Sequence, residues 1–130
     1  MMHSSIFRAY DVRGRYPDEL DAPSVFTISR VAAGMLGRGP VIIAHDARVS
    51  SPALYRAVRR GLEHAGRTVI AAGLATTPMF YFLVNRAKAA GGIMVTGSHT
   101  PREMNGLKVV KSGAEPISGK EVYEYIRRKK

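Results

Sequence analysis

The sequence predicts a three-layer α/β/α fold with a mixed, mostly parallel sheet. Short apolar runs alternate along the chain with stretches whose apolar residues recur at helical spacing, and Pro and Gly mark most boundaries. Strands separated by helices are typical of βαβ units, in which helices cover both faces of a sheet. With 130 residues, of which 45% are hydrophobic, the chain is long enough for a single core. We therefore expect one domain over residues 1–130.

The first helix is expected to begin near Pro23 and to end before Gly37, Gly39 and Pro40. Its apolar face consists of Val25, Ile28, Ala32, Met35 and Leu36. The four apolar residues 41–44 then predict a strand that is buried on both faces.

A second helix follows, for which Ser51 is the expected cap and Pro52 the first residue. Gly66 ends it. The apolar positions are Leu54, Tyr55, Val58, Leu62 and Ala65, and the arginines at 56, 59 and 60 occupy the opposite, solvated face.

Residues 68–72 predict another buried strand, and Thr77 as the cap with Pro78 as the first residue predicts a third helix. Further strands are expected at 93–95 and 107–110, and Ser118 with Glu121 forms the capping box of a final helix. The connection between these last two strands is too short for a parallel crossover. The last strand should therefore be antiparallel and lie at the edge of the sheet.

The composition limits the partners and the compartment. Twenty Lys and Arg against ten Asp and Glu give a formal charge of +10, which favours anionic partners. The absence of cysteine excludes disulfides and thiolate metal sites and fits a cytoplasmic location. No apolar run is long enough for a membrane span, so we expect no membrane partner. A basic nucleic-acid module stays open as an alternative, but no recognition motif supports a specific nucleic-acid partner.

Three polar loops follow the predicted parallel strands, at the edge where α/β proteins bind ligands: HDARVSSP, GLATTP and TGSHTP. In the third loop, Ser98 is not a hydrolase nucleophile elbow, because Thr96 and Thr100 stand where glycines are required. Small residues, a hydroxyl, an imidazole and the nearby Lys108 instead suit a phosphoryl group.

Other candidate sites are weaker. The stretch GAEPISGKE has one residue too many between its glycines for a P-loop and lacks the Ser or Thr after the lysine, so we interpret it as a turn and a helix cap. The spacing of His45, His64, Asp11, Asp46 and Glu103 gives no reason to assign a metal.

The motifs TGSHTP and NGLK together resemble the active-serine signature of the α-D-phosphohexomutases, the phosphoglucomutase and phosphomannomutase family. FRAYDVRG resembles the N-terminal motif of this family, and HDARVSSP resembles its second-strand loop. The motifs occur in the family's order and span nearly the whole chain. The resemblance is therefore to the first, phosphoserine-bearing domain.

The resemblance implies that Ser98 carries the phosphate that moves between O1 and O6 of a hexose phosphate through a hexose 1,6-bisphosphate. Lys108 and Arg13 would stabilise the phosphoryl group and assist proton transfer, His99 would join them as a catalytic residue, and Tyr10 would help these three to bind substrate. Mg²⁺ would bind the phosphorylated Ser98, with its other ligands in a domain that this sequence does not contain. Arg48 is expected to be structural.

The sequence also departs from the family pattern. Thr100 replaces a usual asparagine and Ala44-His45 replaces Gly-Arg, so local hydrogen bonds and one phosphate contact are expected to differ. The family's metal loop, sugar-recognition loop and C-terminal phosphate loop have no counterpart here. We expect the remaining mutase domains as partners, in the same or a separate chain. The sugar is left open, as is the alternative of a non-catalytic domain that only associates with them.

Overall fold

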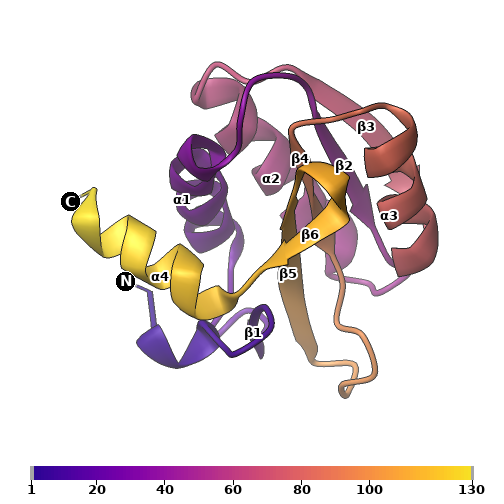
Figure 1. Cartoon of the computed structure of the whole chain (residues 1–130). Helices are drawn as coiled ribbons and strands as arrows, with labels where there is room; N and C mark the ends of the chain where they lie inside the picture. The colour runs from indigo at the N-terminus through magenta and orange to yellow at the C-terminus, as the bar shows by residue number, and fades with distance from the viewer. Residues whose placement is uncertain (1, 130) are drawn as a thin grey trace.

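In the computed structural model, which describes residues 2–129, helices cover both faces of one six-stranded sheet (Figure 1). The predicted three-layer α/β/α class is confirmed. The helices are α1 (Ala22–Ala32), α2 (Ser51–His64), α3 (Thr77–Arg86) and α4 (Gly119–Arg128), with short 3-10 turns η1 (Ser4–Ile6), η2 (Ala33–Met35) and η3 (Ser112–Ala114). The strands are β1 (Val12–Arg15), β2 (Val41–His45), β3 (Val69–Leu74), β4 (Gly91–Val95), β5 (Met104–Lys111) and β6 (Glu115–Ile117).

The sheet has the order β1-β5-β4-β2-β3, and β6 also pairs with β5. Strands β4, β2 and β3 are parallel, whereas β5 runs antiparallel to β1, β4 and β6. The strand predicted at 107–110 is therefore antiparallel as expected. It does not itself lie at the edge, because β1 and β6, which are too short to show a clear periodicity, pair with its outer side. The last strand of the chain, β6, is an antiparallel edge strand.

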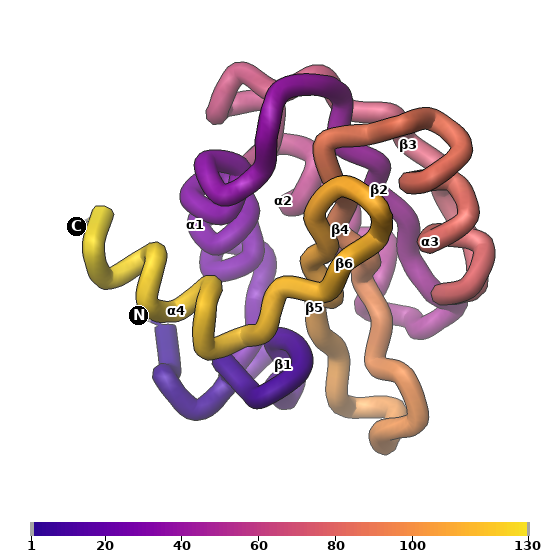
Figure 2. Tube along the Cα trace, viewed as in Figure 1, coloured from indigo at the N-terminus to yellow at the C-terminus, as the bar shows by residue number. Residues whose placement is uncertain are grey.

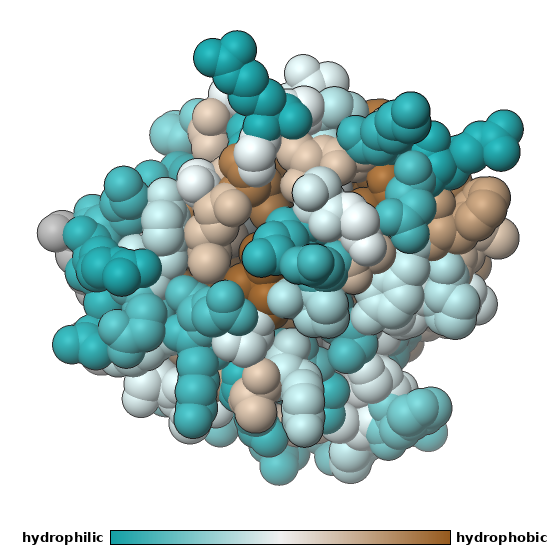
Figure 3. Space-filling view, in the orientation of Figure 1, coloured by the Kyte–Doolittle hydropathy of each residue, from teal (hydrophilic) through white to brown (hydrophobic). Residues whose placement is uncertain are grey.

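Helices α1, α2 and α4 pack on one face of the sheet and α3 packs on the other (Figure 2). Alternate residues of the central strands enter the two cores: Ile43 and Ile93 face the first, and Ile42 and Met94 face the second. Both faces are thus covered, which explains the uninterrupted apolar runs. The outer surface in the view of Figure 3 is mainly hydrophilic, with small hydrophobic areas between polar side chains.

Three local predictions need correction. The strand expected to be buried at 68–72 is β3, which lies at the sheet edge and is half-exposed because no strand within residues 2–129 covers its outer side. Ser51 does not cap α2, since the cap position belongs to Ser50, whose side chain makes no capping bond. The cap of α3 is Thr76 and not Thr77, and its hydroxyl accepts a hydrogen bond from Met79 N at 3.2 Å.

The capping box of Ser118 and Glu121 at the start of α4 is confirmed, with hydrogen bonds of 2.9 and 3.1 Å. This helix lies across one end of α1 (Figure 1). None of the helices within residues 2–129 has the length and apolar character needed to span a bilayer.

Helices α1 and α2 pack closely at Gly61. A Cβ at this position would lie 2.5 Å from the carbonyl oxygen of Phe26 and 3.0 Å from the amide nitrogen of Arg30. Both neighbours are backbone atoms of α1, so a side chain at 61 cannot be accommodated by a rotamer change. The whole of α1 would have to move away from α2.

Gly61→Ala should lower the free energy of unfolding by about 1–3 kcal/mol, the range for overpacked cores. Urea denaturation followed by circular dichroism measures this change. Gly37→Ala is the matched control, because a Cβ at Gly37 meets no atom within 4 Å. Equal stabilities of the two variants would contradict close packing of α1 on α2.

Candidate active site

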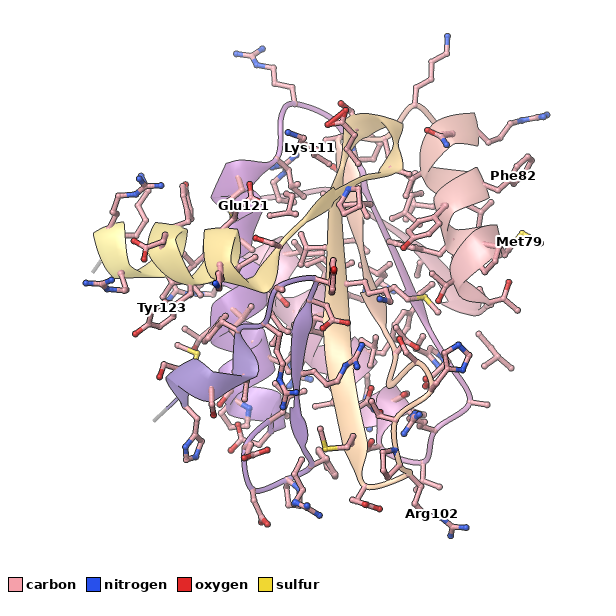
Figure 4. The ribbon with its side chains drawn as sticks, turned by 60° about the horizontal axis from the view of Figure 1, so that its bottom comes forward. Met79, Phe82, Arg102, Lys111, Glu121 and Tyr123 are labelled. Atoms are coloured by element: carbon pink, nitrogen blue, oxygen red, sulfur yellow. The ribbon has the colours of Figure 1, made fainter. Side chains whose placement is uncertain are left out.

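An open cleft of ≈ 950 Å³ lies where the carboxyl ends of the parallel strands meet the loop between β4 and β5. Its position agrees with the expectation that ligands bind at this edge of an α/β sheet. Figure 4 shows this loop at the lower end of the sheet, with the side chain of Arg102 pointing away from the molecule. The cleft is lined by Arg13, Asp46, Thr76, Thr77, Pro78, Tyr81, Thr96, Ser98, His99, Thr100 and Lys108.

Ser98 lies in a tight turn directly after β4. The amide of Thr100 donates to the carbonyl of Gly97 at 3.0 Å, and the Thr100 hydroxyl donates to the same oxygen. The amide of Ser98 donates to the hydroxyl of Thr96 at 3.0 Å. Thr100, which departs from the family pattern, therefore closes the turn with its own hydroxyl.

The backbone of Ser98 has a φ of 54°, in the left-handed region. For a residue other than glycine this conformation costs roughly 1–2 kcal/mol. The surrounding hydrogen bonds must offset this cost, and they leave Ser98 half-buried while His99 is exposed beside it. The strained turn thus presents a serine to the cleft.

Arg48 stabilises this loop from the side of α2. The guanidinium donates to four backbone carbonyls at 2.6–3.1 Å, and these belong to Ser98, Thr100, Pro101 and Met104. A Cβ on Gly97 would overlap the guanidinium of Arg48, so any side chain at this position would displace Arg48 from its carbonyl partners. The expected structural role of Arg48 is confirmed by these contacts.

Asp46 anchors the start of the same loop. Its carboxylate accepts hydrogen bonds from the hydroxyl of Ser51 at 2.5 Å and from the amides of Gly97 and Arg48 at 3.0 and 3.1 Å. Burial alone would raise the pKa of Asp46, but the hydrogen bonds, led by that of Ser51, outweigh it and lower the pKa below the ordinary value of 3.8. Asp46 is therefore held as an ionised anchor.

The buried Asn105 links β5 to the start of α2. Its amide nitrogen donates to the hydroxyls of Ser50 and Ser51 at 2.8 and 3.0 Å, and its oxygen accepts from the amide of Gly106. Ser51 thereby bonds to both Asp46 and Asn105, which fixes the two ends of the serine loop on one helix. The sequence showed Asn105 in the NGLK motif but gave no sign of this role.

Two cations of the cleft share one buried carboxylate. Asp11, whose side chain is 4% exposed, accepts from Nη2 of Arg13 at 2.7 Å and from Nζ of Lys108 at 3.3 Å. Strand β1 pairs with β5 so that Val12 lies opposite Leu107, and this register places the two motifs side by side. About three-quarters of each cationic side chain is buried, and both still reach the cleft.

The structure brings together four of the five residues predicted for the site: Ser98, His99, Arg13 and Lys108 all line the cleft, and their chemical roles stay predictions. The fifth, Tyr10, is 84% exposed and lines a neighbouring pocket that shares only Tyr81 and Lys108 with the cleft.

His45 and three residues of the cleft were not predicted from the sequence as site residues. His45 packs edge-on against Tyr55 with ring centroids 4.6 Å apart and does not line the cleft. Sequence reasoning missed Thr76, Tyr81 and Thr96 as lining residues, although the position of the GLATTP loop after β3 was a usable signal.

A complete divalent-metal site does not fit within residues 2–129. This part of the chain contains no group of three or more His, Cys, Asp or Glu side chains that could hold an ion. Among the described residues, the only carboxylate lining the cleft is Asp46, and its oxygens are already engaged by Ser51, Gly97 and Arg48. Ser98 could therefore provide only part of the ligand set that a divalent metal needs.

Comparison with known proteins relates this architecture to one family. Residues 4–130 match the family model described as phosphoglucomutase/phosphomannomutase, alpha/beta/alpha domain I. A protein of Xanthomonas campestris pv. campestris strain B100, named phosphohexose mutases, is 49% identical over 112 residues. A phosphomannomutase of Salmonella typhimurium is 40% identical over 119 residues. These matches cover 86% and 92% of this chain but only 25% and 26% of the two relatives.

The fold agrees with solved structures. A phosphoglucomutase/phosphomannomutase family protein from Burkholderia thailandensis superposes with a TM-score of 0.90 at 34% identity, covering 99% of this chain and 31% of that protein. A phosphomannomutase homologue from Thermus thermophilus, at 30% identity, gives a TM-score of 0.84 over 98% of this chain and 30% of its own. The chain thus spans about a quarter of the length of the two curated relatives.

The lowered pKa of Asp46 makes part of the stability depend on pH. Because the folded-state pKa lies below 3.8, the hydrogen bonds of Asp46 contribute fully above that pH and are lost as the pH falls through the folded value. Asp46→Asn should therefore flatten the loss of stability below about pH 4. Urea midpoints between pH 2.5 and 6 test this, with the exposed Asp18→Asn as the control. Parallel pH profiles of wild type and Asp46→Asn would contradict the assignment.

Proposed function

Because this chain belongs to the phosphoglucomutase/phosphomannomutase family as its α/β/α domain I, we propose that Ser98 carries the phosphoryl group of a phosphohexomutase. The reaction moves phosphate between O1 and O6 of a hexose phosphate. The observation that best supports the proposal is the presentation of Ser98, on a fixed left-handed turn, in the same cleft as Arg13 and Lys108.

In the proposed reaction, phospho-Ser98 transfers its phosphoryl group to a free hydroxyl of the hexose phosphate. The bond between phosphorus and Oγ of Ser98 breaks while the sugar oxygen forms a new bond to phosphorus, and the proton of the sugar hydroxyl is transferred to the released Oγ of Ser98. The hexose 1,6-bisphosphate then reorients and returns its other phosphoryl group to Ser98. The serine is thereby rephosphorylated and the hexose phosphate is isomerised.

Lys108 and Arg13 have the charge that this chemistry requires. Cations at the cleft wall stabilise the negative charge on the transferring oxygens, and in phosphoryl transfer such positioning and electrostatic stabilisation supply most of the acceleration. We assign the same two residues to assisting proton transfer. His99, at the exposed tip of the turn, and Tyr10, beside the neighbouring pocket, complete the proposed substrate contacts.

The loop contacts support a carrier role. Arg48 and Asp46 hold the backbone on both sides of Ser98, so the main chain that carries the nucleophilic oxygen does not have to be ordered when substrate arrives. A fixed backbone at Ser98 also has the same position when the serine donates and when it accepts a phosphoryl group. This property suits a group that must react in both directions.

Mg²⁺ is proposed as the metal, bound through an oxygen of phosphorylated Ser98. When bound, it would neutralise phosphoryl charge. The other ligands would come from a further domain, since residues 2–129 hold no cluster of three or more ligating side chains.

We further propose that the chain works with the remaining mutase domains, in the same or a separate chain. The two curated relatives are about four times as long as the region they share with it. Hexose phosphate and hexose 1,6-bisphosphate are the proposed small-molecule partners, and the cytoplasm is the proposed location because a chain without cysteine suits a reducing compartment.

The carrier role predicts one phosphate on Ser98. We expect incubation with glucose 1,6-bisphosphate, Mg²⁺ and the unmatched three-quarters of the Xanthomonas relative to add a single phosphate, read by intact mass and peptide mapping. Ser98→Ala should abolish the addition, while Ser112→Ala, which changes a hydroxyl on the turn η3, should not. Phosphate mapped to another residue would overturn the assignment.

The same proposal predicts that the chain alone does not interconvert hexose phosphates. A coupled assay with glucose 1-phosphate or mannose 1-phosphate should give background rates, because gripping and turning the sugar requires further binding surfaces. Supplying the unmatched part of a relative should raise turnover by orders of magnitude, and Ser98→Ala should remove this gain. Turnover of about 1–1000 per second by the chain alone would contradict the proposal.

A further inference from the structure

Asp11 is a buried carboxylate to which the proposed reaction gives no role. Its side chain is 4% exposed, does not line the cleft and accepts hydrogen bonds from Arg13 and Lys108 through the same oxygen, Oδ2. Burying a carboxylate is unfavourable unless cations and hydrogen bonds compensate. Both compensating cations here are cleft residues, so the carboxylate is tied directly to the site.

The position of Asp11 is fixed by its backbone. Its carbonyl accepts from the amide of Arg8 at 2.8 Å, which closes the turn before β1. Gly119, at the start of α4, approaches the backbone of Arg8 and Asp11 so closely that no Cβ would fit. The backbone of Asp11 therefore cannot move with Lys108 or Arg13 if either of them moves toward a ligand.

The charges around Oδ2 determine what the cleft can attract. Arg13 and Lys108 together carry two positive charges, and the Asp11 carboxylate cancels one of them. It also keeps two like charges close together that would otherwise repel each other. Another cation near the loop, Arg48, is paired with Asp46 and with four carbonyls and is not free to respond.

A phosphoryl group must compete with Asp11 for the same donors. It carries between one and two negative charges and presents several acceptor oxygens. If Asp11 were neutral, both cations would be available to phosphate at full charge. Phosphate would then bind more tightly, but a carrier that holds its group too tightly in the ground state loses rate, because only stabilisation specific to the transition state accelerates the reaction.

We propose that Asp11 is a positioning residue that holds Arg13 and Lys108 at the wall of the cleft and limits their attraction for phosphate. The phosphoryl group can then leave Ser98 as readily as it arrives. The inference rests on the proposed function, since it takes the cleft to be a phosphoryl site. A positioning role of this kind predicts that removing the charge of Asp11 tightens phosphate binding, whereas a purely structural role predicts unchanged or weaker binding.

Titration with inorganic phosphate tests whether removing the charge of Asp11 tightens phosphate binding. Titration of the 130-residue chain, followed by NMR of the Lys108 and Arg13 side chains, gives the affinity of the cleft. Asp11→Asn, which keeps the shape of the side chain and one acceptor oxygen, should bind phosphate about tenfold more tightly than wild type. Lys108→Met should bind at least about tenfold more weakly.

The matched control is Asp18→Asn. It removes the same charge from an exposed position that does not line the cleft, and its phosphate affinity should stay within about twofold of the wild-type value. Equal tightening in both Asp variants would show an effect of net charge alone and would overturn the inference. A folded Asp11→Asn variant with unchanged or weaker phosphate binding would overturn it as well.

A second measurement uses only the wild-type chain, so it tests the inference even if Asp11→Asn does not fold. The carboxyl carbon resonance of Asp11 should shift with the same phosphate midpoint as the Lys108 resonance, because phosphate draws the cations away from it. A shift of Lys108 without one of Asp11 would overturn the inference and leave the proposed function intact. Absence of any phosphate binding by wild type would overturn both.

Discussion

The structure of the site depends on a single requirement: three carbonyl oxygens in the loop after β4 and a fourth at the first residue of β5 must be held in one arrangement. Arg48 meets it with one planar guanidinium, which binds the carbonyls of Ser98, Thr100, Pro101 and Met104. Five N–H groups in a rigid fork can do this, whereas the single ammonium of a lysine cannot. Gly97 follows from the same requirement, since any side chain there would displace the guanidinium.

The antiparallel course of β5 completes the site from the other direction. A parallel crossover would have carried the chain away to the far end of the sheet, but β5 returns directly beside β4. Asn105 thereby reaches the start of α2, and Lys108 reaches Asp11 across the pairing of β5 with β1. Three segments distant in sequence thus meet at one edge because a single strand reverses direction.

Sequence reasoning located the loops but not the bonds between them. The apolar runs at 41–44 and 93–95 were predictable because burial on both faces leaves a continuous hydrophobic pattern. Strands β1 and β6 were missed because four and three residues are too few to show a period. Ser51 was predicted as a helix cap from its place before Pro52, but its hydroxyl serves Asp46 and Asn105, a choice fixed by tertiary contacts that no local pattern reveals.

The same division between local and tertiary causes explains why a serine can occupy a left-handed turn here. Taken alone, residue 98 would favour glycine or asparagine, because the conformation is unfavourable for a side chain with a Cβ. Hydrogen bonds of Arg48, Asp46 and Thr100 fix the turn independently of the residue at its centre. These contacts offset the conformational free energy that a left-handed serine costs. Strain that is retained in this way is typical of functional positions. The left-handed turn at Ser98 therefore supports the proposal that its hydroxyl reacts in the cleft.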